Sequence, residues 1–109
     1  MNAPLDGGEF LAEKLGIGAV AINPSIARQL GVETDMQGLA IAAIDPSSDA
    51  ARKGLQRRDI ILSANNQPVP STDALEAIVR DAEERGREAI VLRVQRPRGP
   101  SQYVAVRIQ

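Results

Sequence analysis

The side chains that most often carry out chemistry in proteins are scarce in this chain of 109 residues, which contains no His and no Cys. Their absence excludes His-assisted serine chemistry, thiol nucleophiles and the usual zinc sites. Carboxylates could still pair, but four of them occupy turn or helix-cap positions, where such groups accept bonds from backbone N–H groups. These four are Asp45, Asp49, Asp59 and Asp73. We expect structural roles for them and no catalytic residue.

The sequence also lacks the signals of a phosphate-binding or nucleic-acid-binding protein. No Gly-rich turn is followed by Lys and Ser or Thr, as a phosphate loop requires. Several arginines lie near the C-terminus, but the net charge is −1 and aromatic residues make up 2% of the chain, so a nucleic-acid partner is not expected. These arginines are Arg93, Arg96, Arg98 and Arg107. We expect no cofactor and no metal.

Length and composition indicate one compact domain. With 109 residues, 43% of them hydrophobic, the chain can bury one core. That core must consist of Ile, Leu, Val and Ala, because there is one Phe, one Tyr and no Trp. No run is apolar enough to cross a bilayer, and the N-terminus lacks the order of a signal peptide, so direct membrane insertion is not expected.

The central passage from Gly38 to Val69 predicts strand, short helix, strand and turn. The apolar run Leu39–Ile44 ends at Asp45-Pro46, and Ser47 or Ser48 can cap a helix that Gly54 stops. A second apolar run follows Asp59, and the pair Asn65-Asn66 tolerates the positive φ of a tight turn.

Four further elements flank this passage. Residues 18–22 predict a short strand, and Asn23-Pro24 begins a helix of about two turns. Ser71 or Thr72 caps a long helix to about Arg85, whose apolar stripe is Leu75, Ile78, Val79 and Ala82. Alternation over residues 90–95 and 104–108 predicts a terminal hairpin. Residues 1–10 predict a flexible lead-in, and residues 11–109 the domain.

The central passage resembles a PDZ domain. The positions that carry the resemblance are Ala50-Ala51, Gly54-Leu55, Asp59–Ile61 and Asn65–Val69. It implies an α+β fold: a partly open antiparallel barrel or sandwich of about five strands, with one long and one or two short helices. Two positions depart from the pattern, because Arg58 and Asn66 stand where PDZ domains of this kind usually carry Gly. Arg would be strained in a left-handed conformation, so the turn before Asp59 is expected to be shaped differently.

The order of the elements is similar to that of PDZ domains in bacterial HtrA-type serine proteases, in particular their C-terminal ones, with a permuted strand order. The resemblance implies a non-catalytic domain, an upstream protease domain in the same chain, an oligomeric parent, and a place in the periplasm or cell envelope. Membrane-embedded and carboxy-terminal processing proteases are other possible parents.

The resemblance also implies a peptide-binding site. In PDZ domains an apolar-Gly-apolar loop presents backbone N–H groups to a peptide's terminal carboxylate, and the peptide then joins the sheet as an extra strand. The carboxylate loop here would be Leu15, Gly16 and Ile17. The groove would be lined by Lys14, Ile17, Ala19, Thr72, Glu76 and Val79.

The expected ligands are C-termini or extended segments of protein substrates, with an apolar last residue to suit Ile17 and Val79. Glu76 is expected to disfavour acidic residues upstream of the ligand's C-terminus. Lys14 is expected to add a weak, screened attraction for the ligand's terminal carboxylate. The bound peptide would recruit substrate to a serine protease or regulate it. The alternative is an assembly domain whose groove is closed or filled by its own chain, for which Phe10 and Leu11 are candidate occupants.

Overall fold

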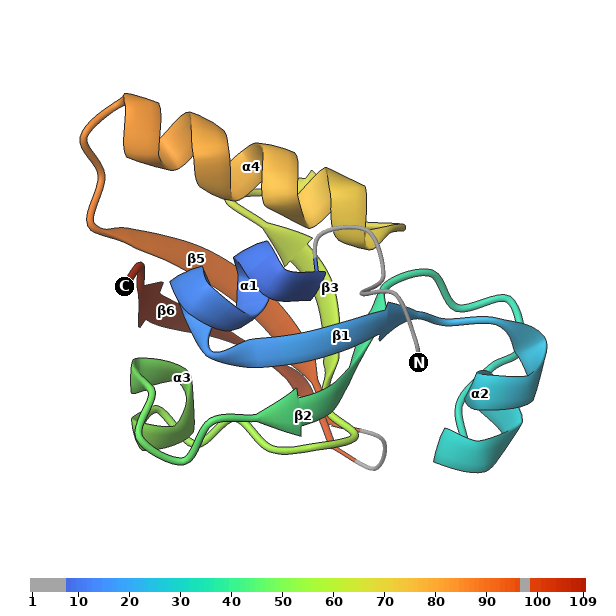
Figure 1. Cartoon of the computed structure of the whole chain (residues 1–109). Helices are drawn as coiled ribbons and strands as arrows, with labels where there is room; N and C mark the ends of the chain where they lie inside the picture. Colours follow the sequence, from blue (N-terminus) through green and yellow to red (C-terminus); the bar gives the residue numbers. More distant parts are fainter. Residues whose placement is uncertain (1–7, 97–98) are drawn as a thin grey trace.

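The computed structural model describes residues 8–96 and 99–109 (Figure 1). Within these ranges the chain forms four helices and six strands. In chain order they are α1 (Gly8–Leu15), β1 (Ile17–Ala21), α2 (Pro24–Leu30), β2 (Leu39–Ile44), α3 (Asp49–Arg52), β3 (Ile60–Ala64), β4 (Gln67–Pro68), α4 (Thr72–Glu84), β5 (Ala89–Gln95) and β6 (Ser101–Arg107).

The strands form one antiparallel sheet in the order β1-β2-β3-β5-β6, and the two-residue β4 pairs with β3. The predicted α+β class with PDZ-like strands is confirmed, and the sheet is open rather than a closed barrel. The prediction of about five strands missed the short β4. The first strand, β1, lies at one end of the strand order and the last, β6, at the other.

The central passage folds as its caps and turns predict. Ser48 is the N-cap of α3, with its hydroxyl accepting a bond from the N–H of Ala51 (3.2 Å). Asn65 and Asn66 take φ angles of 48° and 66° between β3 and β4. Arg58 has a φ of 79°, so the turn before Asp59 keeps the left-handed conformation that glycine normally provides. The expectation of a different turn was wrong.

Helix α4 covers one face of the sheet (Figure 1). It begins after Ser71, whose hydroxyl accepts a bond from the N–H of Ala74 (3.2 Å). Its buried residues are the four predicted from the apolar stripe: Leu75, Ile78, Val79 and Ala82. They join β-branched and leucine side chains of the sheet in one core, so α4 fixes the position of the wall that faces β1.

Helix α1 was not predicted from the sequence, since one or two short helices besides the long one were expected, over other residues. It begins at Gly8, so residues 8–10 belong to a helix rather than to the lead-in expected over residues 1–10; the remainder of that stretch lies outside the described residues. The helix buries Leu11 and Leu15, which are four residues apart and therefore share one helix face. Figure 1 shows α1 between β1 and α4.

Candidate functional site

The outer edge of β1 carries backbone groups that no described strand uses. Asp45 N–H bonds to the C=O of Gly16 (2.8 Å), and Ile22 N–H bonds to the C=O of Gly38 (3.0 Å). These bonds flank the β1–β2 ladder and place Ile17 and Ala19 in its non-hydrogen-bonded pairs. The N–H and C=O groups of both residues therefore point away from β2. Among residues 8–96 and 99–109, no strand pairs with this edge.

The side chains of the same two residues point into the molecule. Ile17 and Ala19 are buried, as is Val79 on the facing helix. These three were predicted to line a groove between β1 and α4, and the structure brings them together in one apolar cluster. An apolar floor beside a free strand edge is the arrangement that β-strand addition requires.

Helix α1 occupies the space above this floor. Leu11 has an exposed fraction of 0%, and Phe10 packs against the same cluster. The guanidinium of Arg80 on α4 lies 4.2 Å from the centre of the Phe10 ring, a cation–π distance. Lys14 Nζ lies 2.8 Å from a carboxylate oxygen of Glu83. In this structure the groove is therefore filled by the chain itself.

The predicted carboxylate loop is reshaped by the same helix. Leu15 is the last residue of α1, and the N–H of Gly16 bonds to the C=O groups of Leu11 (3.1 Å) and Ala12 (3.0 Å). Two of the three predicted donors thus belong to the helix and its C-terminal cap. Only the N–H of Ile17 points toward the open edge. Here the three N–H groups do not converge on one point.

Gly16 is nevertheless fixed by geometry. Its φ is +72°, and a Cβ placed on it would lie 2.4 Å from the Cβ of Ser48. Any larger residue would have both a strained backbone and a clash with the start of α3. The sequence therefore needs glycine here even when no ligand is bound.

The end of the chain holds α1 in place. The N–H of Gln109 bonds to the C=O of Lys14 (2.8 Å), and its side-chain amide bonds to the C=O of Glu13 (2.9 Å). These carbonyls belong to the last turn of α1, where helices leave carbonyl groups without internal partners. The last residue after β6 thus caps the helix that covers the groove.

The remaining predicted groove residues lie on α4 and on α1. Glu76 is half-buried and pairs with Arg80 (3.4 Å), while Thr72 is half-buried at the first position of the helix. Lys14, which was expected to attract a ligand carboxylate, is instead 2.8 Å from Glu83. Glu83 was not among the residues predicted from the sequence to lie at the groove.

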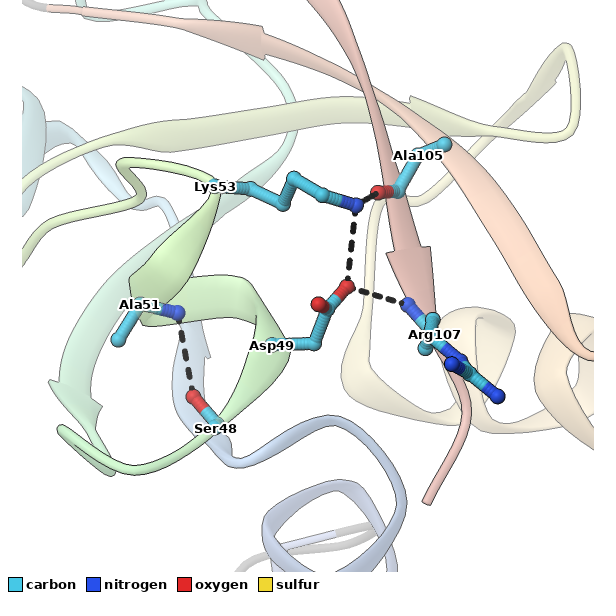
Figure 2. A network of polar contacts seen from close by, with 6 residues as sticks. All are labelled: Ser48, Asp49, Ala51, Lys53, Ala105 and Arg107. Atoms are coloured by element: carbon cyan, nitrogen blue, oxygen red, sulfur yellow. Dashed lines mark hydrogen bonds and ion pairs between the residues drawn. The ribbon is translucent and has the colours of Figure 1, made fainter.

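Three of the four carboxylates predicted to serve backbone groups do so, and the fourth, Asp73, lies in the first turn of α4. Asp49 accepts a bond from the N–H of Arg107 (2.9 Å) and pairs with Lys53 (3.2 Å), which also bonds to the C=O of Ala105 (Figure 2). The bond from Arg107, with a smaller contribution from Lys53, lowers the pKa of Asp49 below its ordinary 3.8. These contacts join α3 to β6. No group of three potential metal ligands occurs in the part of the chain that the structure describes.

Asp45 and Asp59 have similar structural roles. Asp45 accepts bonds from the N–H (2.9 Å) and hydroxyl (2.8 Å) of Ser47, and the first of these is the main cause of its lowered pKa. Asp59 is buried and accepts a bond from the N–H of Gln56 (3.0 Å). These carboxylates thus stabilise turns.

Comparison with known proteins defines the class. The family profile described as PDZ domain matches residues 41–96. The chain therefore belongs to the PDZ domain family, whose members are non-catalytic modules. The longest described helix, α4, has 13 residues, and none of the described helices has the length and apolarity to cross a membrane.

The curated relatives narrow the class further. A probable periplasmic serine endoprotease DegP-like from Rhizobium meliloti is 32% identical over 98% of this chain, and one from Brucella suis is 36% identical over 68% of it. The chain spans only 19% and 14% of these relatives. The predicted kinship with HtrA-type proteases is confirmed, and the names of the relatives agree with the expected periplasmic location.

Solved structures agree with this assignment. The HtrA3 PDZ domain bound to a phage-derived ligand superposes with a TM-score of 0.69 and 22% identity, covering 87% of this chain and 83% of that one. The HtrA-type protease AlgW with a decapeptide gives a TM-score of 0.70 and 25% identity, covering 86% of this chain and 28% of that one. Both neighbours were thus solved with a peptide ligand.

Proposed function

We propose that this domain binds C-termini or extended polypeptide segments by strand addition to β1, and that α1 is a gate that must move before the groove opens. The observation that carries the proposal is that the outward-pointing N–H and C=O groups of Ile17 and Ala19 lie beside a buried apolar floor. The HtrA-type neighbours solved with peptide ligands support a peptide-binding role.

Opening the gate would change the loop as well as the groove. If the last turn of α1 unwinds, the N–H groups of Leu15 and Gly16 lose their helical partners and join Ile17 as donors. Three adjacent donors form the backbone nest that a terminal carboxylate requires. The ligand would replace the apolar contacts of Leu11, so its affinity is reduced by the free energy needed to move α1.

The charged groups beside the groove would then set selectivity. Once α1 moves, the ion pair between Lys14 and Glu83 is broken. Glu76 then lies on the wall of the groove that faces the ligand. Glu76 favours basic over acidic side chains upstream of the ligand's terminus. A Glu76→Lys variant should reverse the ranking of acidic and basic peptides that share one C-terminal residue. An unchanged ranking would contradict this role.

In the parent protein, this domain would recruit unfolded substrates to an upstream serine protease domain or regulate that domain. The setting would be the periplasm, and the parent would be oligomeric. The names of the DegP-like relatives support this placement.

A second candidate is an assembly domain in which α1 never leaves. The burial of Leu11, the two bonds from Gly16 N–H and the two bonds from Gln109 favour it, because each stabilises the filled groove. In that case the surface of α1 and α4, rather than the groove, would contact neighbouring domains.

The two candidates differ in an amide-resolved NMR titration. The isotope-labelled domain is mixed with six-residue peptides that end in Val or Leu, with the same peptides amidated as a control. Peptide binding predicts shifts at Leu15, Gly16 and Ile17 that require the free carboxylate. They should appear at lower peptide concentration in Leu11→Asp, which expels the gate, than in Ala12→Asp, which adds the same charge to the exposed side of α1.

The negative result is also informative. If Leu11→Asp stays folded and these amides do not respond to any peptide, strand addition at β1 is excluded and the assembly role is favoured. A chain that begins at Lys14 offers a second form without the gate.

A further inference from the structure

A basic hollow lies away from the peptide groove, between α2 and the turn that precedes β3. It has a volume of about 710 Å³, and its walls include Arg28, Leu30, Arg57, Arg58 and Arg96. Its lining contains four arginines and one carboxylate, that of Asp59, so the lining has a formal charge of +3. The whole chain has a net charge of −1. Positive charge is thus concentrated at this place.

Two of the four arginines are held by the fold. Arg58 Nη2 donates to the C=O of Gln29 at the end of α2 (3.0 Å). Arg96 Nη2 donates to the C=O of Gly54 (2.8 Å), and its Nε lies 3.8 Å from Asp59. Asp59 is 3% exposed, so its charge is directed inward. These contacts build a fixed wall and leave Asp59 little capacity to neutralise the hollow.

The other two arginines are available. Arg28 and Arg57 are exposed, and neither has a hydrogen bond or ion pair from its side chain to another residue within 8–96 or 99–109. Arg28 lies in the last turn of α2 and Arg57 in the turn that precedes β3, and both line the hollow, so a ligand in it could contact both. A planar guanidinium pairs with a carboxylate through two parallel N–H bonds, which makes such a pair suited to carboxylate groups.

An apolar trough adjoins the basic hollow. A second hollow of about 460 Å³ shares Gln29, Leu30, Arg57 and Arg58 with the first and continues to Val20, Ile26 and Ala42. Since Ile17 and Ala19 point to the core face of the sheet, Val20, next in the strand, points to the opposite face. The combined trough is therefore separate from the peptide groove. In Figure 1, α2 stands clear of the sheet beyond the ends of β1 and β2.

From this arrangement we propose a second binding site, in which the trough takes an acidic polypeptide segment whose carboxylates lie next to apolar side chains. Glu or Asp of the segment pairs with Arg28 and Arg57, and apolar neighbours contact Leu30, Ile26 and Val20. A free phosphate would use the arginines but not the apolar half, so the joint lining favours a polypeptide. The site does not depend on α1 or on strand addition at β1.

The test uses an acetylated and amidated fluorescent peptide in which Glu and Leu alternate, so that no terminal carboxylate can enter the β1 groove. Its control has Gln in place of each Glu. Binding is measured by fluorescence anisotropy, and the contacted amides are identified by NMR. The acidic peptide is expected to shift Gln29, Leu30 and Arg57, and its binding should weaken as salt rises.

Substitutions make the assignment specific. Arg57→Glu is expected to weaken binding of the acidic peptide roughly tenfold or more, because a charge-assisted pair is replaced by repulsion. Arg87→Glu makes the same change in net charge at an exposed arginine outside the trough and should leave the affinity unchanged. Arg28→Glu provides a second variant on the other wall. Thermal denaturation confirms that each variant is folded.

Several outcomes would overturn the proposal. Equal losses in Arg57→Glu and Arg87→Glu would reduce the effect to net charge. Binding of the Gln peptide as tightly as the Glu peptide would remove the arginines from recognition. The same amide shifts with inorganic phosphate or phosphatidylglycerol vesicles, and none with the acidic peptide, would assign the trough to a phosphate group. Each of these results leaves the β1 groove untouched.

Discussion

Replacing Leu11 with Ala should open the groove without unfolding the domain. Leu11 is fully buried, yet α1 is an eight-residue helix at the margin of the core. Truncating a buried leucine to alanine lowers the free energy of unfolding by about 2–5 kcal/mol, and sites that can relax fall at the low end of this range. We expect about 2.7 kcal/mol at this position because α1 can shift on removal of the side chain.

The loss should appear mainly in the local opening of α1. Each 1.4 kcal/mol changes an equilibrium about tenfold, so the open form of α1 should become about a hundredfold more populated. Hydrogen exchange followed by NMR measures this at the amide of Gly16, whose partners are carbonyls of α1. Exchange there should accelerate about a hundredfold, while the amides of β5, which pair with strands on both sides, change much less.

A matched control separates packing from helix propensity. Ala12→Gly lies next to Leu11 on the exposed side of α1 and weakens the helix by about 1 kcal/mol without creating a cavity. It should accelerate the exchange of Gly16 by only about fivefold. The reasoning is refuted if Leu11→Ala leaves the exchange of Gly16 unchanged. It is equally refuted if exchange accelerates to the same extent in β5, because α1 would then unfold only with the whole domain.

Three further substitutions test other features of the fold. Gly16→Ala should cost more than about 2 kcal/mol in urea denaturation, against about 1 kcal/mol for Gly86→Ala; both have φ near +72°, but only the Cβ at residue 16 would meet Ser48. Arg58→Gly should raise the free energy of unfolding by up to about 1 kcal/mol by relieving left-handed strain, and a decrease would show that the bond from Arg58 to α2 matters more. Because the pKa of Asp49 is lowered on folding, its contribution to stability is present above its ordinary pKa of 3.8 and is lost as the pH falls through the lowered folded value. Asp49→Asn should therefore lower the urea midpoint at pH 7 more than at pH 2, and equal effects at both would contradict this.

The fold could be predicted where the sequence carries local signals. Ser48, Ser71 and the pair Asn65-Asn66 act through bonds or φ preferences within a few residues, so their elements were placed nearly to the residue. The apolar stripe of α4 was recognisable for a similar reason, because its period is that of a helix. The conformation of Arg58 was predicted wrongly because the backbone hydrogen bonds that hold its turn are made with Ile41, which is far away in the sequence.

The site was only partly predictable, because its state depends on contacts between distant segments. Ile17, Ala19 and Val79 were placed by the pattern of the family, and they do meet. Helix α1 has a short apolar face and begins near glycine, so its local signal is weak. It is stabilised by the burial of Leu11 and Leu15 and by contacts with Arg80, Glu83 and Gln109, which are distant in the sequence. Phe10 and Leu11 were predicted from the sequence as candidate occupants of the groove. The helical conformation in which they fill it was not predicted.

The contact between Gln109 and the last turn of α1 also bears on chain connectivity. Since the N–H of Gln109 lies 2.8 Å from the C=O of Lys14, Gln109 and the start of β1 are close enough to be joined by a short linker. A permutant in which Gln109 is joined to Lys14, residues 8–13 are left out and the chain is reopened between β1 and α2 would keep every strand neighbour. It would enter β1 from β6 with no helix in between. The groove covered by a preceding helix is therefore a property of this order of segments along the chain, and a rearranged gene would lose it without changing any contact within the sheet.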